Sequence, residues 1–140
     1  MSDTSTNTVN KADTGESNNE RAARTTIDRS NVDTQLLYSL VQAEAGNQDL
    51  DGCRLVADVV LNRIDSSKFP NDLESVVYAP GQFSVVRNGA LKKAQGEISP
   101  KVVQAVDMEL TQARLNYNVL YFNNRPNGSG CWQYGGHWFR

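Results

Sequence analysis

Glu44 is the residue whose type and position in this sequence most clearly suggest chemistry. It follows Leu37, Leu40 and Val41 at the i, i+3, i+4, i+7 spacing of one stripe of an amphipathic helix. The stripe predicts partial burial of Glu44, and burial disfavours the charged form of a carboxyl group. Gly46 is typical of a helix end, so Glu44 would also lie near the negative end of the helix dipole. Both effects raise the pKa of the Glu44 carboxyl, as a general acid at neutral pH requires.

A protonated carboxyl group in a polar cleft can cleave a glycosidic bond, and other residues could complete such a site. Gln82 and Ser84 follow the Pro80-Gly81 turn and could hydrogen-bond sugar hydroxyls or N-acetyl groups. Four aromatic residues offer stacking faces with polar tips: Tyr121, Trp132, Tyr134 and Trp138. A second interpretation stays open, in which Glu44 tilts into water and the aromatic residues belong to the core or its rim.

Most glycosidases use a second carboxylate, and no residue of this sequence identifies itself as that partner. Asp49 and Asp51 are expected to cap the start of a second helix. Asp58 is expected to be an ordinary acidic residue on the surface of that helix.

A nucleophilic thiol is the alternative chemistry. Cys53 lies near a predicted helix start, where the dipole lowers the pKa of a thiol, and His137 could serve as its base. Cys131 with His137 is a weaker pairing, and packing is the favoured role of both cysteines. Because His137 is the single histidine and the two cysteines are far apart, a zinc site is disfavoured and no cofactor is expected.

The composition indicates one soluble domain. Of the 140 residues, 39% are hydrophobic and the net charge is −2, which gives no indication of a nucleic-acid partner or of an anionic membrane surface. Residues 1–33 are rich in Ser, Thr, Asn and Asp and are predicted to be a disordered tail or linker, with the folded domain over residues 34–140. No membrane-spanning stretch and no signal peptide are recognised, so membrane insertion is not expected.

The periodicities predict a mainly helical α+β domain with a small β element. Helices are expected from Asp33 to Gly46, from Asp49 to Ile64 and from Ser99-Pro100 to Ala113, with a short helical turn over Asp72–Tyr78. Strands are expected over Gln82–Val86 and Val119–Phe122, and an extended segment over Trp132–Phe139. The polar segment between Asn123 and Gly130 is expected to be a loop.

Several separated motifs together resemble the cell-wall hydrolase family of bacterial spore cortex-lytic enzymes. The motifs lie in order along residues 34–140: Val41–Gly46, Val59–Ile64, Phe69-Pro70, Val76–Ser84, Leu120–Asn123 and Gly136–Phe139. The resemblance implies a compact, mainly helical, lysozyme-like fold related to lytic transglycosylases. It also implies attack on the glycan strands of peptidoglycan.

The resemblance assigns roles to particular residues. The family's catalytic glutamate falls on Glu44, and Gln82, Phe83, Ser84, Tyr121 and Phe122 are expected to line the cleft. His137 matches a late histidine, with a role that is either substrate contact or structural. As a lytic transglycosylase, the protein would need one acid only and would leave a 1,6-anhydro product. The implied partner is peptidoglycan and the implied place of action is the cell wall, with the protein acting as a monomer and by an unknown export or release route. A cysteine peptidase of wall peptides and a silent glycan-binding domain remain the alternatives.

Overall fold

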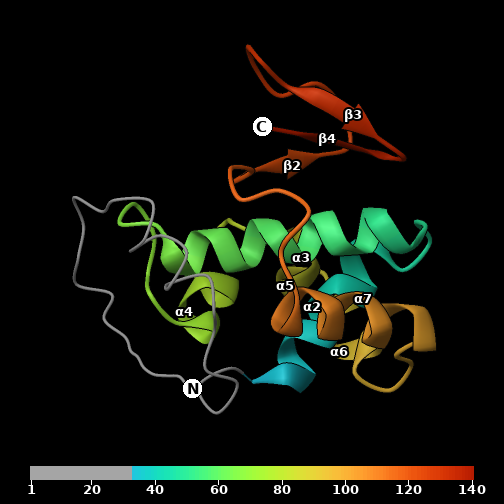
Figure 1. The fold of residues 1–140 in the computed structure, drawn as a ribbon. Coiled ribbons are helices and arrows are strands. Elements are labelled where there is room, and N and C mark those ends of the chain that lie inside the picture. The colour runs from blue at the N-terminus through green and yellow to red at the C-terminus, as the bar shows by residue number, and fades with distance from the viewer. Residues whose placement is uncertain (1–32) are drawn as a thin grey trace, which may run out of the picture.

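The computed structural model describes residues 33–140, so the predicted tail lies outside the described residues except for Asp33. Helices come first in this part of the chain and a small sheet follows (Figure 1). The helices are α2 (Thr34–Ala45), α3 (Leu50–Asp65), α4 (Leu73–Tyr78), α5 (Ser84–Arg87), α6 (Ala90–Ala94) and α7 (Pro100–Thr111). The strands are β2 (Phe122–Asn123), β3 (Trp132–Tyr134) and β4 (His137–Phe139). The predicted α+β class is confirmed.

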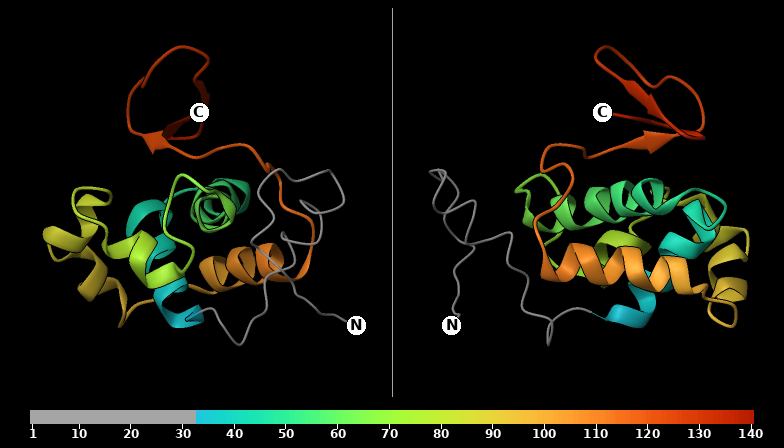
Figure 2. Two further views of the ribbon diagram at one scale, coloured as in Figure 1. Left: turned by 90° about the vertical axis from the view of Figure 1, so that its left-hand side faces the viewer. Right: turned by 45° about the vertical axis from the view of Figure 1, so that its right-hand side comes forward.

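Helix α3 is the centre of the domain. Its residues are buried without interruption from Gly52 to Ile64. Helices α2, α4 and α7 pack against α3, and the sheet lies beyond its opposite side in all three ribbon views (Figures 1 and 2). A helix covered on all sides cannot keep polar residues on an exposed face, and this determines the environment of its charged side chains.

The predicted helix ends are confirmed by their caps. Asp33 accepts a hydrogen bond from the backbone N–H of Leu36, and Asp49 accepts one from that of Gly52. Ser99 caps α7, and Pro100 occupies its first turn. Gly46 ends α2 in a helical conformation, and a Cβ atom there would lie 2.6 Å from the backbone oxygen of Gln42. A side chain at position 46 would therefore collide with Gln42.

Two predicted strands are wrong in type or extent. Gln82–Val86 is not a strand: Gly81, at a φ of 76°, and Gln82 form a turn, and α5 follows as a single helical turn with Val85 buried. A short apolar run fits either a strand or a buried helical turn, and among the described residues no strand pairs with it. The strand expected over Val119–Phe122 is reduced to β2, although the backbone N–H groups of Leu120 and Tyr121 both reach the Arg140 carbonyl. Helix α6 is not predicted by the periodicities.

The three strands form an antiparallel sheet in the order β2-β4-β3. Phe122, Phe139 and Trp132 lie opposite one another across the strands and therefore share one face. Phe139 is fully buried between them, and the Trp132 ring stacks on it with the centroids 5.1 Å apart. His137 pairs with Tyr134 next to the β3–β4 turn. The extended segment predicted over Trp132–Phe139 is thus a β-hairpin.

Candidate active site

Glu44 lies in the last turn of α2, at the end of the predicted apolar stripe. Leu37, Leu40 and Val41 are fully buried, and Glu44 itself is half-buried. Burial raises the pKa of the Glu44 carboxyl to about 7. Within residues 33–140 this carboxyl group makes no hydrogen bond or ion pair. The group is therefore close to half protonated at neutral pH, and no contact in this part of the chain competes for its proton.

His137 supports the backbone at Glu44. The imidazole is 8% exposed and forms a hydrogen bond with the backbone carbonyl group of Glu44. It also meets the edge of the Phe122 ring, with the centroids 5.2 Å apart. Burial lowers the pKa of His137 in spite of this hydrogen bond, so the ring is neutral at neutral pH. This position favours the structural role of His137 over direct contact with a sugar.

The β3–β4 turn is attached to the segment that joins α2 to α3. The side-chain oxygen of Gln48 accepts a hydrogen bond of 2.8 Å from the backbone N–H of Gly136. The Tyr134 hydroxyl donates to Asp49 Oδ2 at 2.9 Å. The hydrogen bond from the Gly52 backbone lowers the pKa of Asp49, and the bond from Tyr134 lowers it further. Asp49 is thus a cap and an anchor for the hairpin. Both oxygens of Asp49 are engaged in these structural bonds, so its surroundings do not suggest a second catalytic acid.

Aromatic rings connect the Glu44 region to the predicted cleft residues. The Phe122 ring lies between His137 and Phe83, 6.1 Å from the centroid of the latter. The Phe83 ring in turn lies 5.1 Å from the guanidinium carbon of Arg63, which also contacts Tyr121 and hydrogen-bonds Gln82. The structure therefore brings five of the predicted residues into one continuous group: Gln82, Phe83, Tyr121, Phe122 and His137.

Ser84, the sixth residue predicted beside Glu44, lies at the edge of this group. It is the exposed first residue of α5, and no side-chain contact among the described residues joins it to the others. Phe83 is 5% exposed, so it packs beneath the more exposed residues of this group. Tyr121 and Phe122 are half-buried.

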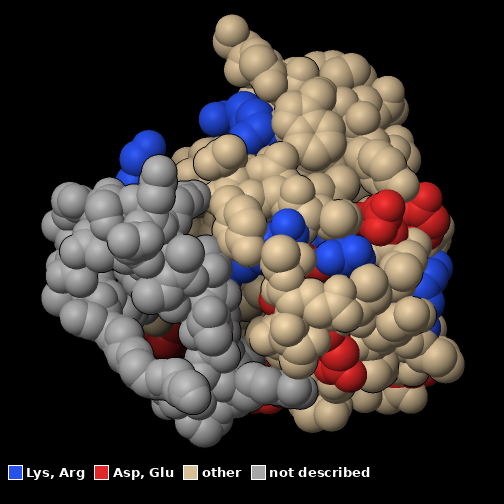
Figure 3. All heavy atoms as spheres, in the orientation of Figure 1, with Lys and Arg blue, Asp and Glu red and all other residues tan. Residues whose placement is uncertain are grey.

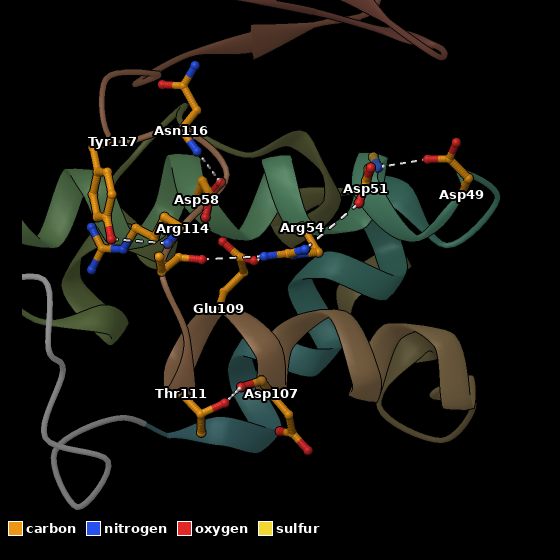
Figure 4. Close-up of polar contacts among 12 residues, drawn as sticks. Asp49, Asp51, Arg54, Asp58, Asp107, Glu109, Thr111, Arg114, Asn116 and Tyr117 are labelled. Carbon is orange, nitrogen blue, oxygen red and sulfur yellow. Dashed lines mark hydrogen bonds and ion pairs between the residues drawn. The ribbon is translucent and has the colours of Figure 1, made fainter.

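Asp58 is a buried acid, so its predicted place on the helix surface is wrong. The side chain is fully buried in α3, and its Oδ2 accepts a hydrogen bond from the backbone N–H of Asn116 (Figure 4). Burial raises the pKa of Asp58, and the nearby Glu109 carboxylate raises it further by a hydrogen bond and by its charge. Asp58 is thus protonated at neutral pH and donates to Glu109. Glu109 in turn is paired with the Nε of Arg54.

The thiol alternative finds no support in the environment of Cys53. The Cys53 side chain is buried, and its Sγ–H donates to the carbonyl oxygen of Ala45 at 3.1 Å. Burial raises the pKa of the Cys53 thiol, which is the opposite of what a nucleophilic cysteine needs. Cys131 is half-buried, and neither cysteine is in a disulfide.

Neither surface charge nor metal ligands indicate a further site among the described residues. In Figure 3 acidic and basic side chains are interspersed over the helical part of the face, and the sheet part is mostly uncharged. No group of three or more His, Cys, Asp and Glu residues in positions 33–140 could hold a metal ion. None of the described helices is both long and apolar enough to cross a membrane.

Comparison with known proteins gives consistent matches. The sequence profile of the cell wall hydrolase family matches residues 47–139, a span that starts just after Glu44. The spore cortex-lytic enzyme of Halalkalibacterium halodurans is 32% identical over 115 residues, which are 82% of this chain and 34% of the relative. That of Oceanobacillus iheyensis is 30% identical over 100 residues, or 71% of this chain and 35% of the relative.

A solved structure gives the same result for the fold. The catalytic domain of the germination-specific lytic transglycosylase SleB from Bacillus anthracis superposes with a TM-score of 0.63 at 26% identity. The superposition covers 76% of this chain and 92% of that domain. The chain spans about a third of the length of the curated relatives it matches, so the likeness is to one part of those proteins.

Proposed function

Because the chain belongs to the cell wall hydrolase family, we propose that it cleaves the glycan strands of peptidoglycan with Glu44 as acid and base. The observation that carries the proposal is the Glu44 carboxyl: half-buried, without a partner among the described side chains, and with a pKa raised to about 7. That value suits a group that must give a proton and take one back near neutral pH. The structural neighbour from Bacillus anthracis is a lytic transglycosylase, which favours that reaction class.

A lytic transglycosylase needs one carboxyl group used twice. Protonated Glu44 gives its proton to the oxygen between N-acetylmuramic acid and N-acetylglucosamine, and the bond from that oxygen to C1 of the muramoyl residue breaks. The Glu44 carboxylate then takes the proton of the muramoyl C6 hydroxyl, whose oxygen bonds to C1. The product is a 1,6-anhydro sugar, no water is consumed, and Glu44 is protonated again. The reaction is consistent with the other acids near Glu44 in sequence, because Asp49 is a cap and Asp58 is buried.

The remaining residues of the proposal bind the strand. Gln82, Ser84, Tyr121 and Phe122 offer polar and aromatic contacts to the sugars, and Phe83 and His137 support them from below. Since Glu44 and these strand-binding residues belong to one chain, the enzyme would act as a monomer at the cell wall. Light scattering of the active protein tests the monomer.

The test is to compare Glu44→Gln with Glu97→Gln, a control at an exposed acid between α6 and α7. Purified peptidoglycan is digested, and turbidity and the masses of the products are measured. Losing the general acid should reduce cleavage by about 10²–10⁴-fold, whereas Glu97→Gln should cleave as the wild type does. The wild-type product should carry an anhydromuramoyl end, lighter by one water than a hydrolysis product. Full cleavage by Glu44→Gln would refute the proposed role, and binding without any product in the wild type would indicate a silent glycan-binding domain.

A further inference from the structure

Arg63 is a buried cation that the proposed reaction does not use. The side chain belongs to the last turn of α3 and the residue is only 4% exposed. No carboxylate within residues 33–140 forms an ion pair with it. A buried charge without an ionic partner is costly, so the groups that surround the guanidinium must compensate for lost water.

Three aromatic rings and one carbonyl group provide this compensation. The guanidinium carbon lies 4.8 Å from the centroid of the Phe69 ring, 5.1 Å from that of Phe83 and 5.3 Å from that of Tyr121. These are cation–π distances. The Nε–H donates to the carbonyl oxygen of Leu120 at 2.8 Å. Burial lowers the pKa of Arg63, but a guanidinium group remains charged at neutral pH. The rings and the Nε bond together fix the plane of the guanidinium.

A second nitrogen of this fixed group determines how Gln82 points. The NH1 atom of Arg63 donates to Oε1 of Gln82 at 3.2 Å. An arginine has five N–H donors and no acceptor, so only the amide oxygen of Gln82 can face it. The amide nitrogen of Gln82 has no partner among the described residues, and the residue is exposed. Gln82 therefore turns its two N–H donors toward solvent, while Arg63 engages one lone pair of its amide oxygen.

We propose that Arg63 is a positioning residue that makes Gln82 a hydrogen-bond donor to an acetamido carbonyl oxygen of the glycan strand. The inference rests on the proposed function and specifies one contact of that site. Sugar hydroxyls both donate and accept, whereas an acetamido carbonyl oxygen only accepts, so it needs N–H donors such as those that Arg63 turns outward on Gln82. Gln82 is connected to the backbone of Glu44 through Phe83, Phe122 and His137, so both residues belong to one packed group.

The first test exchanges the chemistry of the contact through Gln82→Glu. Kinetics are measured on glycan strands that are fully N-acetylated and on strands that have been chemically de-N-acetylated. The glutamate would keep one oxygen on Arg63 and turn the other outward as an acceptor. It should raise KM for acetylated strands by about 10-fold and shift the ratio of the two KM values toward de-N-acetylated strands, whose amines are cationic.

The control for this test is Gln104→Glu, an exposed residue of α7 away from the site, which should leave both KM values unchanged. An unchanged KM ratio in Gln82→Glu would overturn the inference while leaving the proposed function intact. A wild-type protein that cleaves neither kind of strand would instead remove the proposed function.

The second test asks whether Arg63 acts through Gln82. Arg63→Lys keeps the positive charge but loses the forked group, so KM should rise several-fold with kcat changed by less than about 2-fold. Because the effect passes through Gln82, the double variant Arg63→Lys with Gln82→Ala should have the KM of Gln82→Ala alone. Melting temperatures are measured in parallel. If the two KM increases multiply, as expected for a merely structural arginine, the inference fails.

Discussion

Burial raises the pKa of both the Glu44 and the Asp58 carboxyl groups, yet their surroundings are opposite. Glu44 lies at the end of α2, is half-buried, and has no side-chain partner among the described residues. Asp58 lies in the middle of α3, is fully buried, and is held by the Asn116 backbone and by Glu109 (Figure 4). Arg54 and Arg114 lie in the same buried region, where Arg114 contacts Asn62 and Asp65.

The difference shows that a raised pKa alone does not identify a catalytic acid. The Asp58 proton is already engaged in a hydrogen bond to Glu109, and no substrate can reach it. The proton of Glu44 has no such acceptor within residues 33–140 and lies at the surface. A group suited to proton transfer therefore combines a raised pKa with access and a missing partner.

The largest effect on stability is expected at the buried pair. Glu109→Ala removes the buried carboxylate that pairs with Arg54 and leaves this cation with Asp51, 4.0 Å away, as its remaining ion-pair partner. The free energy of unfolding should fall by about 3–5 kcal/mol, measured by urea denaturation. Activity per folded molecule should stay at the wild-type level, because the pair touches no residue of the proposed site.

The control for this variant is Glu97→Ala, an exposed acid whose loss should change the unfolding free energy by no more than about 0.5 kcal/mol. If Glu109→Ala abolished cleavage without loss of stability, the buried Asp58–Glu109 group would take part in catalysis. That result would contradict the contrast drawn between Glu44 and Asp58.

A smaller effect is expected from Glu44→Gln, and it should depend on pH. The Glu44 carboxyl has an ordinary pKa of 4.5 and one of about 7 in the folded protein, so the folded state binds more protons between these values. Wild-type stability should therefore fall as pH rises from about 4.5 to 7 and stay low above that, whereas Glu44→Gln lacks this loss. The unfolding free energy of Glu44→Gln minus that of the wild type should therefore be larger at pH 8 than at pH 4, by at most about 3 kcal/mol. Hydration of the half-buried carboxyl group reduces this difference. A gain independent of pH, in urea denaturation across this range, would contradict the raised pKa.

The smallest effect is expected from Asp58→Asn at low pH. An asparagine can accept from the Asn116 backbone and donate to Glu109 as protonated Asp58 does, so stability near pH 4 should change by less than about 1 kcal/mol. Above that pH the variant should gain on the wild type, because the raised pKa of Asp58 makes the wild type lose stability. This is the same sign as for Glu44→Gln, but cleavage should be retained. Loss of cleavage in a folded Asp58→Asn protein would remove the distinction between the two acids.

Much of the helical framework could be predicted, because its signals are local. Asp33, Asp49 and Ser99 are caps that a short stretch of sequence identifies, and the stripe ending at Glu44 has helical spacing. The segment from Gln82 to Val86 could not be assigned in this way. Its conformation depends on the turn at Gly81 and on the burial of Val85, which are tertiary facts.

The candidate site divides along the same line. Glu44 can be found because one acid interrupts an apolar stripe, whereas Phe83, Tyr121 and Phe122 are assigned to the cleft through family motifs. Arg63 is visible in the sequence only as part of a motif, since its contacts join separated segments. The burial of Asp58 could not be predicted because its partner lies on another helix, and nothing in the spacing of α3 reveals that α7 will cover it.

The bond between Gln48 and Gly136 joins segments 88 residues apart, and it has a consequence for biosynthesis. During translation the acid-bearing helix leaves the ribosome long before the hairpin that supports it through His137. The nascent chain therefore lacks the hydrogen bond between His137 and the Glu44 backbone until the hairpin has been made. The proposed cleavage would therefore start only after the hairpin has been synthesised.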